Sequence, residues 1–197
     1  MSDINVASRA LPQGNQWLKR YYFSRSAFSV VWVAAAFALG RSDSAISAAL
    51  LLLYPLWDAA ANFVDAMRNG GLRRNATQAL NVGVSAVTTV VVAIALGRGM
   101  NAVLVVFGIW AALAGLFQLA TAVRRWKSHG AQWAMILSGA QSALAGVVFI
   151  TQGSGPTVPS ITDIAPYAAF GAFYFLVSAI WLAVSDTRRR RAAFINT

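Results

Sequence analysis

The sequence predicts an all-α fold: a polytopic membrane bundle of six transmembrane helices, arranged as three hairpins. Composition is the first observation behind this prediction. Hydrophobic residues make up 58% of the 197 residues and charged residues only 11%, with a mean hydropathy of +0.58. A soluble domain of this size could not hide so much apolar surface. The alternation of apolar and polar residues that is typical of membrane β-strands is absent from the sequence.

The second observation is the length of the apolar runs. A helix rises 1.5 Å per residue, so crossing a hydrocarbon core of about 30 Å takes around 20 residues. Six runs meet this length: 21–40, 44–66, 78–96, 101–123, 133–150 and 164–185. We therefore expect a six-helix membrane domain over 21–185. It would lie between a cytoplasmic N-terminal tail, 1–20, and a basic cytoplasmic C-terminal tail, 186–197.

Basic residues are unevenly distributed between the ends of these runs. Of the 16 Lys and Arg residues, 14 lie near the start of the first run or after the second, fourth and sixth; Arg41 and Arg98 occupy the alternate loops. This asymmetry predicts that both termini and the basic loops face the cytoplasm. Because the basic residues form four short segments and no domain of their own, nucleic acid is not an expected partner.

The basic segments are expected to bind membrane lipids. Each Lys or Arg near an anionic surface contributes about 1 kcal/mol of attraction. The longest basic run lies in the C-terminal tail, where we expect contacts with anionic headgroups: Arg188, Arg189, Arg190 and Arg191.

An internal repeat supports the hairpin arrangement. Ala-Leu-Gly-Arg at 38–41 recurs at 95–98, and Phe-Gly-Ile-Trp at 107–110 recurs loosely as Phe-Gly-Ala-Phe at 170–173. Hairpins of one orientation are parallel repeats about an axis along the membrane normal. Equivalent aromatic residues are then expected at one depth: Trp57, Trp110 and Phe173.

Small residues at helical spacing predict close contact between two of the helices. Ser138, Ser142 and Gly146 are four residues apart on the fifth run, and Ala111 and Gly115 form a similar pair on the fourth. Small side chains allow two helix backbones to approach closely inside a membrane.

Two segments carry a resemblance to a known family. The glycine-punctuated stretches 107–120 and 132–146 resemble the hairpins of the HdeD-like acid-resistance membrane proteins, whose defining domain is a short hydrophobic repeat. The likeness rests on hairpin order, a Trp that opens the helix after a basic loop, and glycines at recurring depths. It implies a six-span bacterial inner-membrane protein, linked in some members to survival of acid stress. It brings no catalytic motif.

A polar stripe within the second run is the candidate functional site. Tyr54, Asp58, Asn62 and Asp65 are spaced by four, four and three residues, so they lie on one helix face. Burying an ionisable side chain at bilayer depth costs roughly 2.5 to 3.5 kcal/mol, so such residues mark functional positions by default.

The stripe has two interpretations. In the first, it is a proton or cation relay in which a desolvated Asp58 takes up a proton as the outside acidifies. In the second, the stripe joins helices: Asp65 pairs with Arg68 or Arg73, while Asp58 is protonated or hydrogen-bonded to a neighbour. The side chains expected to take part in these bonds across helices are Tyr54, Asn81, Ser85, Gln118, Gln141 and Tyr174.

Enzyme chemistry is not expected. An intramembrane aspartyl protease needs two Asp residues on opposed helices, whereas Asp58 and Asp65 share one helix, and the single histidine, His129, lies in a loop. With no cysteine and no dense ligand cluster, we expect no metal and no cofactor. The favoured function is a structural or protective role under envelope stress. The alternative is a small transporter or channel for protons or another cation, and a homo-oligomer is left open.

Overall fold

The computed structural model describes residues 3–127 and 132–195, which are mostly helical and contain no strand. Six long helices follow one another: α1 (Asp3–Ala35), α2 (Ser44–Arg68), α3 (Ala76–Leu96), α4 (Met100–Arg125), α5 (Gln132–Gly153) and α6 (Ala165–Ile195). Three shorter helical segments lie between them: the π-helix η1 (Ala36–Gly40) and the 3-10 helices η2 (Leu72–Arg74) and η3 (Ile161–Asp163). The predicted all-α fold is confirmed.

Each of these six helices contains a segment long and apolar enough to cross a membrane, judged over the described residues. These segments agree with the six predicted runs to within five residues at every end. The chain is therefore a multi-pass membrane protein.

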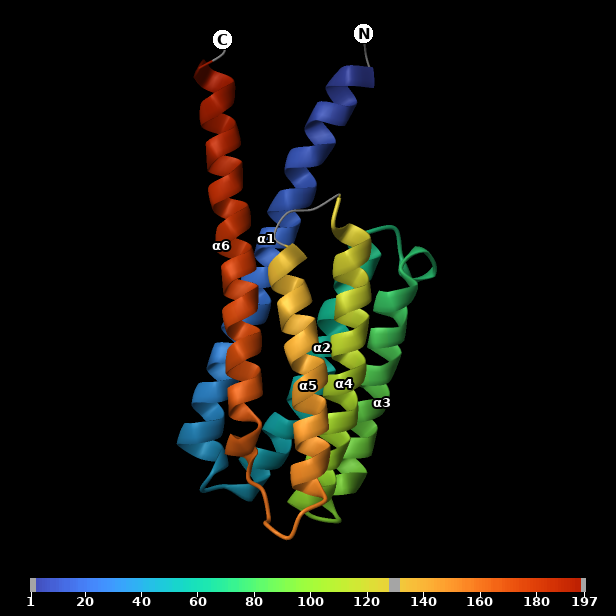
Figure 1. Cartoon of the computed structure of the whole chain (residues 1–197), viewed down its shortest axis with the longest axis vertical. Coiled ribbons are helices and arrows are strands. Elements are labelled where there is room, and N and C mark those ends of the chain that lie inside the picture. The colour runs from blue at the N-terminus through green and yellow to red at the C-terminus, as the bar shows by residue number, and fades with distance from the viewer. Residues whose placement is uncertain (1–2, 128–131, 196–197) are drawn as a thin grey trace.

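The segments predicted as tails continue the first and last helices. Helix α1 begins at Asp3 and α6 extends to Ile195, and both project beyond the same end of the bundle (Figure 1). An ion pair of 2.6 Å between Lys19 and Asp186 joins the two helices at this end. Arg188 is exposed; residues 1–2 and 196–197 and the side chains of 189–191 lie outside the description.

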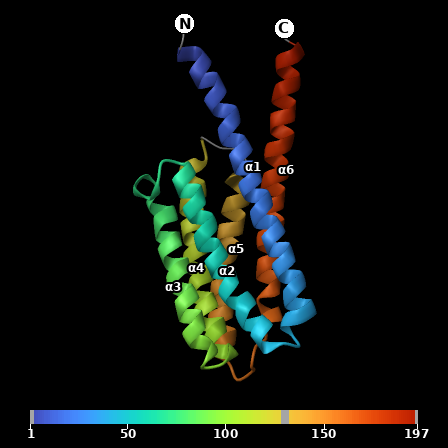
Figure 2. The same cartoon turned by 180° about the vertical axis from the view of Figure 1, so that it is seen from behind.

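The helices run antiparallel to their neighbours along the chain, but the first also packs on the last. Helix α1 lies against α6, while α2, α3, α4 and α5 pack on one another in sequence order (Figures 1 and 2). The α2 to α3 connection, the last turn of α4 and the first turn of α5 lie at the end that carries both termini (Figure 1). The basic segments consequently gather at that end.

Helices α4 and α5 form the closest contact of the bundle, because glycines face each other across it. A β-carbon added at Gly146 would lie 2.5 Å from the carbonyl oxygen of Gly108, and one at Gly115 would lie 2.6 Å from that of Gly139. No side chain fits in such a space. The close contact expected from small residues on these two helices is confirmed.

The ends of α2, the helix that carries the polar stripe, are fixed locally. The carboxylate of Asp43 accepts hydrogen bonds from the backbone N–H groups of Ala45 at 2.8 Å and Ile46 at 3.0 Å, which caps the first turn. At the other end the chain turns through Gly70 and Gly71, whose φ angles are +96° and +88°. Glycine adopts these left-handed conformations without the steric cost of a side chain.

Two apolar clusters fill the bundle and leave a polar layer between them. The larger lies toward the end opposite the termini and includes Trp32, Leu51 and Phe107. The smaller lies toward the termini and includes Tyr22 and Leu182. The buried polar side chains of α2 and α3 lie between these clusters and beside the smaller one: Asp58, Asp65, Asn81 and Ser85.

The proposed equivalence of the three hairpins stays a prediction. Two of the residues aligned by the repeat have different surroundings, since Trp110 is 2% exposed and Phe173 is 57% exposed. Similarity in sequence between these spans does not extend to the roles of their aromatic residues.

Substituting a glycine between α4 and α5 tests how much the bundle depends on this contact. We expect Gly146→Ala to lower the free energy of unfolding by about 1 to 3 kcal/mol, because the new methyl group overlaps the backbone of α4. Denaturation of the purified protein in mixed detergent micelles measures this energy.

Gly83→Ala on α3 is the matched control. A β-carbon at Gly83 meets no atom within 4 Å, so this change should leave stability unchanged or raise it by up to about 1 kcal/mol through helix propensity. Equal losses in both variants would contradict the assignment of the α4 to α5 contact.

Candidate functional site

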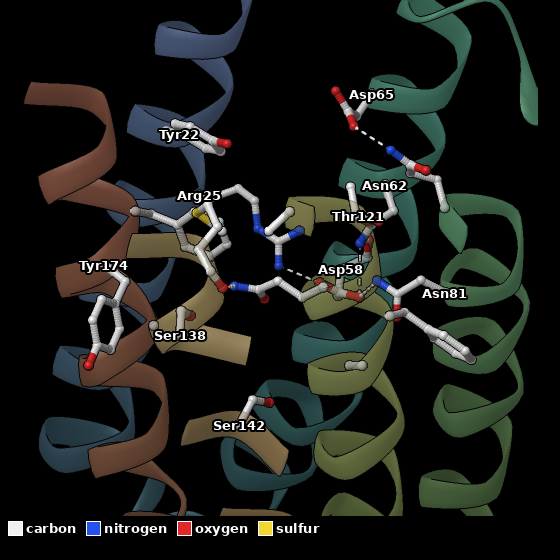
Figure 3. A pocket seen from close by; sticks show the side chains of 18 of the residues that line it. Tyr22, Arg25, Asp58, Asn62, Asp65, Asn81, Thr121, Ser138, Ser142 and Tyr174 are labelled. Carbon is white, nitrogen blue, oxygen red and sulfur yellow. Dashed lines mark hydrogen bonds and ion pairs between the residues drawn. The ribbon is translucent and has the colours of Figure 1, made fainter. Parts of the chain in front are cut away.

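A cavity of about 90 Å³ lies in the polar layer and is lined by side chains from all six long helices. Figure 3 shows that residues of the predicted stripe and of the neighbouring helices point into it. One water needs at least about 10 to 15 Å³ of such space, so the cavity has room for a few water-sized molecules. Four of its lining residues are charged: Arg25, Asp58, Asp65 and Arg125.

Asp58 is the most heavily bonded side chain of the site. It is 6% exposed, and its Oδ1 accepts a hydrogen bond from the guanidinium of Arg25 (Figure 3). Its Oδ2 accepts bonds from Ser85 Oγ at 2.9 Å, Asn62 Nδ2 at 3.1 Å and Asn81 Nδ2 at 3.2 Å. Both carboxylate oxygens are thus held by donors from α1, α2 and α3.

Arg25 links α1 to two other helices. Its guanidinium donates to Asp58 on α2 and to the hydroxyl of Tyr21 at 3.1 Å, and lies 4.5 Å from the centre of the Phe175 ring on α6. Attraction between a cation and an aromatic face strengthens when both are shielded from water. In the sequence, Arg25 belongs to the basic residues near the start of the first run, but its place inside run 21–40 is a signal that it is buried.

The polar contacts extend from Asp58 to α4. Ser85 is completely buried, and its hydroxyl accepts a hydrogen bond of 2.9 Å from Trp110 Nε1 while donating to Asp58. Bonds in series therefore connect α4, α3, α2 and α1. The side-chain oxygen of Asn81 is buried and has no hydrogen-bond donor among the described residues.

Asp65 forms a second ion pair with an unexpected partner. It is 2% exposed, and its Oδ2 lies 2.8 Å from Arg125 Nη2 at the end of α4. Asn69 Nδ2 donates to Oδ1 at 2.9 Å and Gln78 Nε2 lies 3.4 Å from Oδ2. Asp65 is therefore held by groups from α2, α3 and α4.

The two expected partners of Asp65 lie elsewhere. The guanidinium of Arg68 is 4.9 Å from the ring centre of Trp17 on α1, and Arg73 is exposed in η2. These two arginines follow Asp65 closely along the chain, but neither pairs with it in the described structure. Arg125, in the last turn of α4, lines the cavity and takes this place.

The other predicted partners are distributed around the cavity. Tyr54 packs against the rings of Trp32 and Trp110, with ring centres 4.9 and 5.7 Å away. Gln118 donates to the carbonyl oxygen of Met135 at 3.2 Å, which joins α4 to α5. Two more line the cavity without bonding to Asp58 in the described part of the chain: Gln141 and Tyr174.

The charges of the site balance. Two guanidinium groups face two carboxylates, and each carboxylate has its own arginine. A buried charge is tolerated when it is paired and its remaining hydrogen-bonding atoms are satisfied. No group of three or more His, Cys, Asp or Glu residues occurs among the described residues, and His129 lies outside them.

Comparison with known proteins gives one match. Residues 83–151 match the family described as "Short repeat of unknown function (DUF308)". The matched stretch runs from the middle of α3 through α4 to the end of α5, about a third of the chain. It contains Ser85, which donates to Asp58, and Trp110, which donates to Ser85, but neither aspartate of the site. No curated protein and no solved structure matches the chain, so no named relative supports the HdeD-like resemblance.

A double-mutant cycle tests the ion pair between Arg25 and Asp58. Arg25→Gln leaves the carboxylate of Asp58 buried without its counter-ion, which should cost about 3 to 5 kcal/mol of stability. Adding Asp58→Asn removes the stranded charge and should recover more than half of this loss. The free energy of unfolding in detergent micelles measures each step of the cycle.

The pair between Lys19 and Asp186 is the control, because its side chains are 20% and 17% exposed. Neutralising either partner there should cost at most about 1 kcal/mol. If Arg25→Gln costs no more than this, the buried pair does not hold the bundle together.

Proposed function

We propose that the protein is a non-enzymatic component of a bacterial inner membrane with a structural, protective role under acid or envelope stress. The observation that carries the proposal is the full engagement of Asp58, whose two oxygens are held by Arg25 and by three further side chains. A carboxylate fixed in this way joins helices. A proton could reach it only by competing with the guanidinium.

The same geometry supports a function without catalysis. General acid–base chemistry needs a group that is free to give or take a proton beside a reacting atom. Asp58 and Asp65 instead each face an arginine, and they do not face each other as an opposed acid pair. The stress-related part of the proposal rests on the HdeD-like resemblance. The match to a short-repeat family over 83–151 covers the two segments that carry this resemblance, but gives no function.

Proton or cation movement is the second candidate, and the cavity favours keeping it. About 90 Å³ of space adjoins both carboxylates. Because Arg25 and Arg125 line the same space, a metal cation would meet two positive charges beside the two negative ones. A proton is therefore the better candidate for movement through this cavity.

The pair of variants Asp58→Asn and Asp58→Asn with Arg25→Gln separates the two candidates. The single variant should lose thermal stability and acid survival together, because it strands the cation of Arg25. The double variant carries no buried charge at this position, so a structural role predicts that melting and acid survival both recover. Melting in detergent and survival of cells after acid shock provide the two readouts.

Proton flux in proteoliposomes provides the decisive comparison. For a structural role, wild type and double variant should both show the flux of empty vesicles. A double variant that melts like wild type but loses a flux present in wild type would overturn the structural proposal in favour of a relay.

The proposed orientation has its own test. Reporter fusions after Arg191 and at Arg73 should read cytoplasmic, and a fusion within 153–159 should read external, because 14 of 16 basic residues lie on one side. A C-terminal fusion that reads external would contradict the cytoplasmic placement of both termini.

A further inference from the structure

An apolar groove runs along the outer face of the bundle between α3 and α4. It has a volume of about 450 Å³ and is separate from the polar cavity. We call it the outer groove; its lining includes Leu80, Gly83, Val87 and Val91 from α3 and Ile109 and Leu113 from α4. Leu80, Val87 and Ile109 are each at least half exposed, at 56%, 63% and 50%.

Gly83 creates the depth of the outer groove. A β-carbon at this position would have no atom within 4 Å, whereas one at Gly115 or Gly146 would overlap a neighbouring backbone. Helix packing within the described residues therefore does not require a glycine here. Glycine inside a helix is less stable than alanine. What Gly83 provides in return is the open space beside α3.

The length of the outer groove matches one leaflet of a bilayer. From Ala79 to Val91 the helix rises by about 18 Å at 1.5 Å per residue. Half of a hydrocarbon core of about 30 Å is roughly 15 Å deep. The groove also starts in the first turns of α3, close to the basic end of the bundle. One acyl chain of the leaflet at that end would fill it along its length.

Positive charge lies directly beyond this end of the groove. The guanidinium of Arg124 donates to Thr77 Oγ1 at 3.2 Å, and Thr77 in turn lies 2.9 Å from Thr121 Oγ1. Arg124 is exposed, and among the described residues no carboxylate is within ion-pairing distance of it. Arg73 and Arg74, also exposed, precede α3 by a few residues.

We propose that the outer groove binds one acyl chain of an anionic phospholipid whose phosphate is held by Arg124 beside Thr77. The apolar lining fits the chain, and the basic end complements the phosphate. A second copy of the protein is the competing occupant. Copies inserted in the same orientation and joined through this face would bring two Arg124 side chains and their neighbouring arginines together, and this repulsion favours the lipid. The proposal is independent of the role of Asp58.

Native mass spectrometry of the full chain in detergent, with equal amounts of dioleoyl phosphatidylglycerol and dioleoyl phosphatidylcholine, tests the proposal. Wild type should retain one phosphatidylglycerol in preference to phosphatidylcholine. Gly83→Phe fills the groove and should reduce this retention about tenfold. Arg124→Gln should reduce the preference for phosphatidylglycerol about fivefold while phosphatidylcholine still binds, because only the charge contact is lost.

Val147→Phe is the matched control, because it adds the same ring at an exposed position of α5, where Val147 is 60% exposed. It should retain lipid as wild type does, and detergent melting shows whether each variant is folded. Unchanged retention in a folded Gly83→Phe, or unchanged preference in Arg124→Gln, would overturn the proposal. So would a wild-type dimer that Gly83→Phe dissociates, since the occupant would then be a second copy.

Discussion

The pairing of Arg25 with Asp58 is the constraint around which the rest of the bundle is arranged. Neither charge is stable alone at this depth, so α1 and α2 must meet in the one register that brings guanidinium and carboxylate together. Ser85 on α3 then donates to Asp58 and accepts a hydrogen bond from Trp110 on α4, and the ring of Phe175 on α6 lies against the guanidinium. One electrostatic requirement thereby orients five of the six long helices described.

The ion pair between Arg125 and Asp65 fixes a second contact of α2, nearer the end of the bundle that carries the termini. Helix α2 supplies both acids, and its neighbours supply the bases, Arg25 from α1 and Arg125 from α4. Helix α2 is thus held from two directions at two depths. Inside a bilayer, burial of apolar side chains does not favour one helix neighbour over another, so hydrogen bonds and ion pairs give the contacts between helices their specificity. The two apolar clusters fill the remaining space.

The sequence predicted the helices and the shared face of the stripe, because both follow from local periodicity. It named Asn81 and Ser85 as candidate partners, and both bond to Asp58, but it did not predict the two arginines that pair with the carboxylates. Arg125 is the last residue of α4. A basic residue there is expected from the membrane orientation alone, so the local sequence does not show that its side chain turns inward to pair with Asp65. Arg25 could have been recognised, since it lies inside run 21–40. The packing of α1 on α6 joins opposite ends of the chain, a relation that periodicity does not encode.

The glycine contact between α4 and α5 limits how the bundle can move. With backbones this close, a sliding or rolling movement of one helix would drive its side chains against the backbone of the other helix at Gly108 or Gly146. We therefore expect α4 and α5 to behave as one rigid body. The contact between α5 and α6 is much less extensive than the one between α4 and α5, so the bundle resists deformation less at that contact than between α4 and α5.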